Sequence, residues 1–293
     1  MEGIMNRLAS LQQCTGCSAC SSMCPQQCIH MIMNAEGFLY PAIDRSKCTD
    51  CGLCEKVCPI VSEDHAAKGY PLEVWGAKAL DDAVREKSSS GGIFSLLANL
   101  VLGSGGYVFG AAYTEDFRNV NHRMIHSMKE VQLLRGSKYM QSNLTGGGYQ
   151  VVKEKLDAGA QVLFSGTPCQ IKGLMAYLQR EYDNLLTVEI ICHGVPSAKL
   201  WQKYIDFLRN RKGRVFERVN FRDKCHGWKM YGLKIEFNGQ KSYYHSHIRD
   251  SYMQMFLQNL SLLPSCYRCQ AKEKGSGAAR RFMTFKKSLH VHL

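Results

Sequence analysis

The runs CTGCSACSSMCP (residues 14–25) and CTDCGLCEKVCP (residues 48–59) decide how the start of the chain folds. Both follow the pattern C-x2-C-x2-C-x3-C-P, in which cysteines three residues apart let one loop contact three corners of a cubane. The fourth cysteine, which precedes the proline, points away and binds the other cluster of a pair. The spacing therefore predicts two 4Fe-4S clusters. The first is assigned to Cys14, Cys17, Cys20 and Cys58, and the second to Cys48, Cys51, Cys54 and Cys24.

Other interpretations of these cysteines fit the pattern less well. A structural zinc ion held by paired C-x-x-C knuckles needs four sulfurs, and it does not require that each run end in Cys-Pro. A secreted disulfide scaffold would be shorter and would spread its cysteines through the fold, whereas nine of the 14 cysteines lie in the first 60 residues. Cys28 lies outside the pattern and is interpreted as a buried thiol.

Length and composition predict two globular domains in a chain of 293 residues with 45% apolar residues. The sequence contains neither a run long enough to predict a membrane span nor the apolar segment of a secretory signal, so we expect a cytoplasmic protein. The formal net charge of +12 raises the possibility of nucleic acid binding. Because basic and aromatic residues do not alternate on one face, we expect no nucleic acid partner.

Strand and helix patterns alternate after the cysteine-rich segment. Apolar runs predict strands at residues 74–79, 107–113, 122–127, 162–165 and 186–192. Helical patterns occupy residues 91–102, 145–158, 168–181 and 197–211. Residues 215–221, 233–237 and 241–245 predict a meander with a hairpin turn at Asn238 and Gly239. We therefore expect a small ferredoxin-like α+β module followed by an α/β domain with a mixed sheet.

Four of the remaining cysteines suggest a third thiolate site. Cys169 and Cys192 each follow a predicted strand, and open α/β sheets bind ligands at the carboxyl ends of their strands. Cys266 and Cys269 form a C-x-x-C pair in a loop. By spacing alone, a 4Fe-4S cluster, a zinc site and unrelated buried thiols all remain possible. Cys225 is interpreted as a non-ligand.

Six motifs occur in order over residues 74–269: SSSGGIFSLLA (88–98), GSKYMQS (136–142), LFSGTPCQIKGL (163–174), CHGVPS (192–197), FRDKCHGW (221–228) and SCYRC (265–269). Together they resemble the coenzyme F-420 hydrogenase/dehydrogenase beta subunit family, and residues 1–60 resemble bacterial two-cluster ferredoxins. The family resemblance implies FAD and one 4Fe-4S cluster in the body. By motif position, the ligands of this third cluster would be Cys169, Cys192, Cys266 and Cys269.

The resemblance also implies where the flavin binds. Serines and glycines at the start of a helix suit a pyrophosphate, although an ordinary capped helix has the same pattern. Lys138 and Tyr139 would supply a cation and a ring, unless they are a solvated lysine and a core tyrosine. The candidate flavin residues are Ser89, Ser90, Gly91, Gly92, Lys138, Gly166 and Thr167.

Residues 270–293 depart from the family pattern, because they are basic and contain none of its motifs. We interpret them as a truncated or frame-shifted end, or as a basic docking arm. The expected organisation is a ferredoxin domain at residues 1–60, a linker at 61–73, the family-like domain at 74–269 and this tail.

The predicted function is that of an iron-sulfur flavoprotein oxidoreductase. It would move electrons between the clusters and a flavin that exchanges hydride with a deazaflavin or another small-molecule acceptor or donor. A non-catalytic electron-relay subunit of a larger redox complex is the alternative. Either function requires a redox partner protein or subunit.

Overall fold

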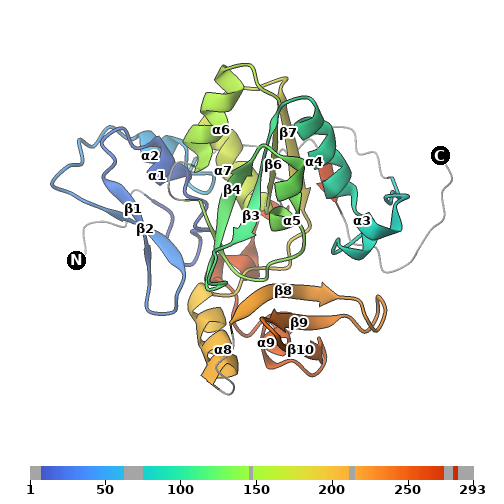
Figure 1. Ribbon diagram of the computed structural model, residues 1–293. Helices are drawn as coiled ribbons and strands as arrows, with labels where there is room; N and C mark the ends of the chain where they lie inside the picture. Colours follow the sequence, from blue (N-terminus) through green and yellow to red (C-terminus); the bar gives the residue numbers. More distant parts are fainter. Residues whose placement is uncertain (1–7, 63–74, 145–147, 211–214, 274–279, 283–293) are drawn as a thin grey trace.

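Three sheets organise the computed structural model, which describes residues 8–62, 75–144, 148–210, 215–273 and 280–282 (Figure 1). A two-stranded sheet belongs to the N-terminal module, a six-stranded mixed sheet forms the centre of the body, and a three-stranded sheet lies below it in Figure 1. No helix within these residues is long and apolar enough to cross a membrane.

The N-terminal module repeats its backbone as well as its sequence. Helix α1 (Ala19–Met23) and helix α2 (Leu53–Lys56) each lie within one cysteine run. Their N-cap residues, Ser18 and Gly52, stand at matching positions of the two runs and both adopt the left-handed conformation, with φ of 66° and 73°. Strands β1 (Ile29–Met33) and β2 (Leu39–Ile43) form an antiparallel hairpin between the runs.

The central sheet has the order β11-β7-β6-β3-β4-β5, with only the β3–β4 pair antiparallel. Its strands are β3 (Tyr107–Tyr113), β4 (Val120–Ile125), β5 (Ser142–Asn143), β6 (Val162–Gly166), β7 (Leu185–Ile190) and β11 (Arg280–Phe282). Parallel strands buried on both faces read as continuous apolar runs, which is why residues 107–113 and 162–165 are recognised from the sequence. The predicted mixed α/β sheet is confirmed.

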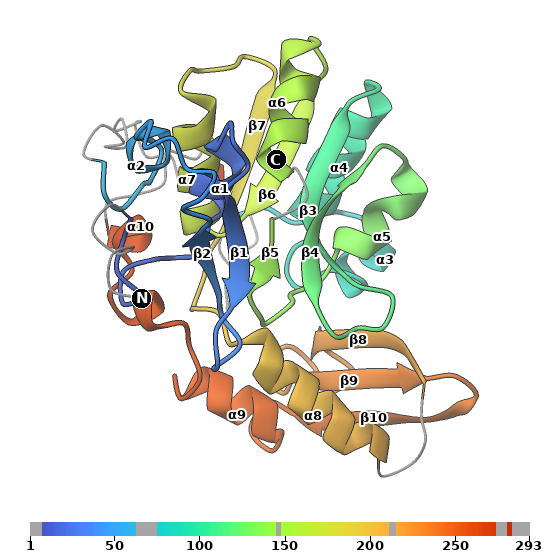
Figure 2. The ribbon, with the colours of Figure 1, turned by 90° about the vertical axis from the view of Figure 1, so that its left-hand side faces the viewer.

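Helices cover both faces of this sheet. Helices α6 (Gly148–Asp157) and α7 (Pro168–Leu178) pack on one face through a core that includes Phe164. Helix α4 (Ile93–Gly103) and the short helix α5 (Val131–Leu134) pack on the other face through a core that includes Leu163. The N-terminal module lies on the α6 and α7 side, as Figures 1 and 2 show, and its Cys17, Ala19 and Val57 belong to that core.

The third sheet is the predicted meander of β8 (Phe216–Asp223), β9 (Gly232–Phe237) and β10 (Gln240–Ser246). The β9–β10 turn contains Gly239 with a φ of 64°. Helix α8 (Ala198–Asn210) and helix α9 (Ser251–Leu257) pack with this sheet around the buried Trp201 (Figure 2). Four short elements complete the described chain: α3 (Asp82–Glu86), the 3-10 helices η2 (Met128–Glu130) and η3 (Pro264–Arg268), and α10 (Gln270–Glu273).

The structure differs from the sequence prediction in several places. Residues 75–79 of the predicted strand 74–79 form no regular element and instead pack on the loop before α4, where Ala79 N donates to Gly91 O at 2.7 Å. Helix α9 was not predicted from the sequence. No strand was predicted in the tail, where Arg280–Phe282 pair in parallel with β7. Most of the predicted linker, residues 63–73, lies outside the described residues.

Candidate cofactor sites

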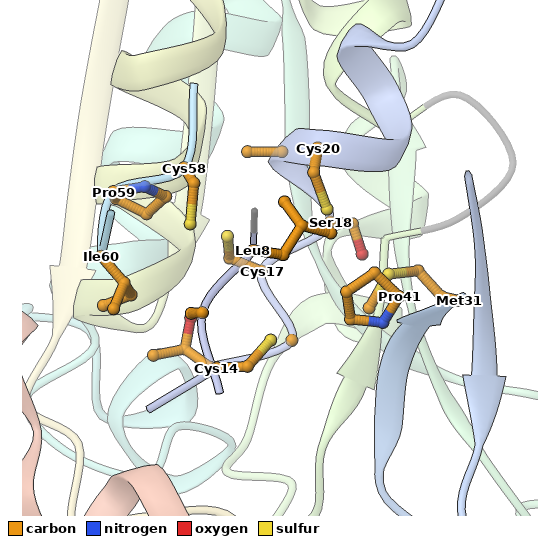
Figure 3. A pocket seen from close by; sticks show the side chains of 14 residues that line it. Leu8, Cys14, Cys17, Ser18, Cys20, Met31, Pro41, Cys58, Pro59 and Ile60 are labelled. Carbon is orange, nitrogen blue, oxygen red and sulfur yellow. The ribbon is translucent and has the colours of Figure 1, made fainter. Parts of the chain in front are cut away.

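The first thiolate site is a pocket in the N-terminal module. Figure 3 shows the sulfurs of Cys14, Cys17, Cys20 and Cys58 facing a common space, with Met31, Pro41, Pro59 and Ile60 also on its walls. Burial raises the pKa of Cys14 to about 11 and that of Cys17 to about 12, and the nearby Cys58 thiol contributes to both shifts. Thiols that are this close together and this buried lose their protons only when bound cations stabilise the thiolates. The side chains therefore fit an iron-sulfur cluster, whose irons supply that positive charge.

The body helps to shape this pocket. Gly16 has a φ of 65°, and a Cβ there would lie 2.5 Å from Gln141 Nε2 and 2.8 Å from Leu39 O. Only glycine therefore suits this loop position. Gln141 Oε1 accepts a hydrogen bond from Leu39 N at 2.8 Å, which ties the GSKYMQS motif to β2. Spacing alone did not single out Gln141.

The second thiolate site has five cysteines around one pocket: Cys24, Cys28, Cys48, Cys51 and Cys54. Asp50 and Gly52 turn the chain between the last three of these cysteines with φ of 52° and 73°. Each pocket therefore combines three cysteines of one run with the last cysteine of the other. The ligand assignment itself stays a prediction. Within the described ranges, no three His, Cys, Asp or Glu side chains form a group that could hold a single metal ion.

The crossed arrangement predicts the effect of a Cys58→Ala substitution. Cys58 lies in the second run but lines the first pocket. We expect the variant to lose the cluster held by Cys14, Cys17 and Cys20, with a fall of about four irons per chain. Iron analysis and EPR would check this. Loss of the signal assigned to Cys48, Cys51 and Cys54 instead would show that the assignment is wrong.

Iron removal should have a local effect, because the helices of the N-terminal module are only four and five residues long. A segment with so little core depends on its clusters for folding. We expect an iron chelator to unfold residues 1–60 while the central sheet stays folded. Limited proteolysis should then cut first at residues 61–73. A first cut within residues 90–200 would contradict this prediction.

The third set of thiols comes together at the carboxyl ends of β6 and β7. These strands are parallel neighbours, so Cys169 at the start of α7 and Cys192 after β7 emerge at the same edge. Burial raises the pKa of Cys192 to about 12, and the charges of Cys266 and Cys269 act on it as well. Burial and the Cys192 thiol likewise raise the pKa of Cys169. The structure brings all four predicted residues close enough for their charges to interact.

The first and third thiol sets are adjacent. A Cβ on Gly173 of α7 would lie 3.0 Å from Cys17 Cβ and Cys17 Sγ. Tyr149 lies between the sets and donates a hydrogen bond to Gln170 O at 2.8 Å. Burial raises the pKa of Tyr149, and Cys17 and Cys169 both contribute. One helix therefore presents Cys169 to the third set and packs on Cys17 of the first.

The loop that was predicted to bind the flavin pyrophosphate lies beside the GSKYMQS motif. Ser137 N and Ser137 Oγ donate to Ser89 Oγ at 2.7 and 3.0 Å. The N-cap of α4 is Gly92 with a φ of 87°, and no side chain caps the described helix. A Cβ on Gly91 would lie 2.8 Å from Ala77 O, which shows that this glycine packs against residues 77–78 of the chain. Ser90 lies in the same half-buried loop.

The Lys138 side chain is hydrogen-bonded to backbone carbonyl oxygens of its own turn, including Gly136 O at 3.2 Å. Its ammonium donates to Leu134 O at 3.1 Å and to Arg135 O at 2.9 Å. Burial lowers the Lys138 pKa to about 7. Its Nζ is 5.8 Å from the centre of the Tyr113 ring. The ring of Tyr139 stacks on Phe256 with centroids 4.5 Å apart, in agreement with the core alternative for that tyrosine.

A hydrogen-bonded network holds Gly166 and Thr167, the last two candidate flavin residues. Thr167 N donates to Gln170 Oε1 at 3.0 Å, and Gln170 Nε2 donates to Ser142 Oγ at 2.7 Å. Ser142 Oγ is 3.2 Å from His122 Nδ1, and His122 Nε2 is 3.1 Å from Ser165 O. Burial lowers the pKa of His122 to about 4, so the ring is neutral. The turn at the end of β6 is thus fixed by residues from two other strands.

Lys224 of the FRDKCHGW motif is a further site residue that was not selected from the sequence. Its Nζ donates to Arg85 O at 2.9 Å and to Ser88 O at 2.7 Å, and it lies 4.1 Å from the centre of the Trp228 ring. The motif contributed to the family resemblance, but its sequence did not indicate that Lys224 holds the loop at Ser88.

Comparisons with known proteins agree with the resemblance. Residues 13–61 match the family model described as a 4Fe-4S dicluster domain. Residues 159–275 match the model for the C terminus of the coenzyme F420 hydrogenase/dehydrogenase beta subunit. The predicted family resemblance and the predicted pair of 4Fe-4S clusters are confirmed. No curated protein matches the chain.

One solved structure with a similar chain is the F420-reducing [NiFe] hydrogenase complex from Methanosarcina barkeri. The two chains share 17% identity with a TM-score of 0.44, over 66% of this chain. This chain spans 63% of the length of that one. Similarity at this level carries no argument about activity.

Proposed function

For an iron-sulfur redox protein related to the coenzyme F420 hydrogenase/dehydrogenase beta subunit, we propose the function of a flavin-dependent oxidoreductase. The protein would exchange electrons between its N-terminal clusters and a hydride acceptor or donor such as a deazaflavin. The observation that carries the proposal is the contact between Cys17 and Gly173, which joins the first thiol set to the helix that holds Cys169. A bound FAD would convert hydride transfer into the single-electron steps of iron-sulfur clusters.

The different exposure of the first and second thiol sets supports electron transfer between a partner protein and the body. In the second set Cys51 is exposed, whereas in the first set Cys17 is buried. The second set can therefore face a partner protein, whereas the first contacts the body through Cys17. Cys169, Cys192, Cys266 and Cys269 would hold a third cluster, which continues the series toward the carboxyl ends of β6 and β7.

The flavin would bind at this same edge of the sheet. Hydrogen bonds between Ser137 and Ser89 join two of the candidate loops. Thr167 follows β6 and is the N-cap of α7, the helix that holds Cys169. Tyr113 Oη is buried at the end of β3 without a hydrogen-bond partner among the described residues. A buried hydroxyl that lacks a partner is costly, so a polar ligand group near Lys138 would stabilise it.

One observation favours the alternative of a non-catalytic electron relay. Ala77 O occupies the space beside Gly91. The backbone of the chain itself, and not a ligand, therefore makes the close approach that this glycine permits. A relay subunit would keep the thiol sets and their contacts without a flavin of its own.

Anaerobic purification with iron, sulfide and flavin analysis separates the two functions. The proposed oxidoreductase retains flavin, and the isolated chain reduces a hydride acceptor. Clusters without flavin would instead favour the relay.

A Lys138→Met variant should lose flavin but keep its iron, whereas the exposed Lys129→Met control should keep both. Equal flavin in the two variants would exclude Lys138 from the site.

A further inference from the structure

We propose that Cys28 is a reserve ligand of the second iron-sulfur site and can replace Cys24. The inference rests on the two-cluster module and does not depend on the flavin. Cys28 lies outside both cysteine runs, so the motif spacing assigns it no role. The structure nevertheless gives the second pocket five thiols, one more than a 4Fe-4S cluster uses.

The distance between the sulfurs supports this role. Cys24 Sγ and Cys28 Sγ are 3.3 Å apart, and both residues line the pocket with Cys48, Cys51 and Cys54. The Cys28 side chain also interacts with that of Cys48. It is only 2% exposed, so its thiol is confined beside the pocket and is not free to turn into solvent.

The backbone holds Cys28 more firmly than Cys24. Cys24 is the C-cap of the short helix α1, where the chain leaves the helical conformation. Cys28 directly precedes β1, and its carbonyl accepts a hydrogen bond from Asp44 N at 2.8 Å beside the Ile29–Ile43 pair. The turn between them is closed by Gln27 N, which donates to Cys24 O at 3.1 Å. Because the hairpin anchors Cys28, its sulfur stays at the pocket when Cys24 is absent or displaced.

The exchange needs no oxidant or reductant. The bond from iron to Cys24 Sγ breaks and a bond from the same iron to Cys28 Sγ forms. The Cys28 thiol proton moves to the Cys24 thiolate that is released, over the short distance between the two sulfurs. The number of thiolates on the cluster and its charge are unchanged.

Three variants of the full-length chain test the proposal. Cys24→Ala should keep the iron content of the unmodified protein but change the EPR signal of the second cluster, because one ligand now comes from another backbone position. Cys28→Ala alone should keep both the iron and the original signal. The Cys24→Ala, Cys28→Ala double variant should lose about four irons per chain. A Cys24→Ala, Cys225→Ala control removes the same number of thiols, one of them the exposed Cys225, and should keep its iron.

A small thiol distinguishes a missing ligand from a misfolded module. Reconstitution of the double variant with 2-mercaptoethanol should restore the lost iron if the site is otherwise intact. Loss of about four irons in Cys24→Ala alone would overturn the proposal, as would full iron content in the double variant without added thiol. A Cys24–Cys28 disulfide in the cluster-loaded protein, detected by mass spectrometry, would also overturn it. Absence of flavin from the unmodified chain would count against the proposed function and leave these results unaffected.

Discussion

A Cys169→Ala, Cys192→Ala double variant is expected to contain about eight irons per chain, compared with about 12 for the unmodified protein, since each complete ligand set holds four. Both thiols stand at the ends of neighbouring parallel strands. Cys192 interacts with both cysteines of the C-x-x-C pair, and Cys169 interacts with Cys266. Removing two of four ligands leaves too few thiolates for a cluster. Iron and sulfide analysis after anaerobic purification measures the difference.

The exposed Cys225 provides the control, because it lies outside the three thiol sets. A Cys225→Ala variant should keep about 12 irons. If the unmodified protein and the double variant both contained about eight, the third cluster would be absent. Zinc in the unmodified protein that disappears from the double variant would mean that the four thiols form a metal site without a redox role.

A Gly173→Val variant is expected to separate the N-terminal module from the body. The Cβ would lie 3.0 Å from Cys17 Cβ, Cys17 Sγ and Tyr149 Oη, and the two carbons beyond it would need still more space. Added volume in a packed interior typically costs about 1–3 kcal/mol. Cys17 is part of the first ligand set, so displacement should also loosen that cluster. We expect a lower melting temperature, a loss of up to about four irons and slower electron transfer from the module to the body.

The exposed Gly76 offers a matched control, because a Cβ there meets no atom within 4 Å. Gly76→Val should leave the melting temperature, iron content and electron transfer unchanged. Three hydrogen bonds also fix the module to the body: Leu39 N to Gln141, Gln150 to Ser22 O, and Lys199 to Ala35 O. If these bonds alone held the module, Gly173→Val would behave like the control, and the role assigned to the Cys17 contact would be wrong.

Much of the body could be predicted because its signals are local. The strand predicted at residues 107–113 coincides with β3, and the helix predicted at 168–181 begins with α7 at Pro168. The prediction of a strand at 74–79 was wrong for residues 75–79. This short stretch packs against the loop at Gly91 and does not pair with another strand. Helix α9 has only seven residues, and its buried Tyr252, Met253 and Phe256 obtain their stability from tertiary contacts.

The sequence by itself determined the chemistry of the N-terminal module and the alternation of strands and helices. Both depend on residues a few positions apart, because one loop contacts a cluster and one short run forms a strand. Only the tertiary structure decided that Cys17 packs on Gly173, that Lys224 holds Ser88, and that Cys28 stands 3.3 Å from Cys24 within a five-thiol pocket. These contacts depend on how turns and helices are oriented and on which surfaces pack together. That orientation follows from the balance of burial and hydrogen bonding over the whole chain, which no local spacing records.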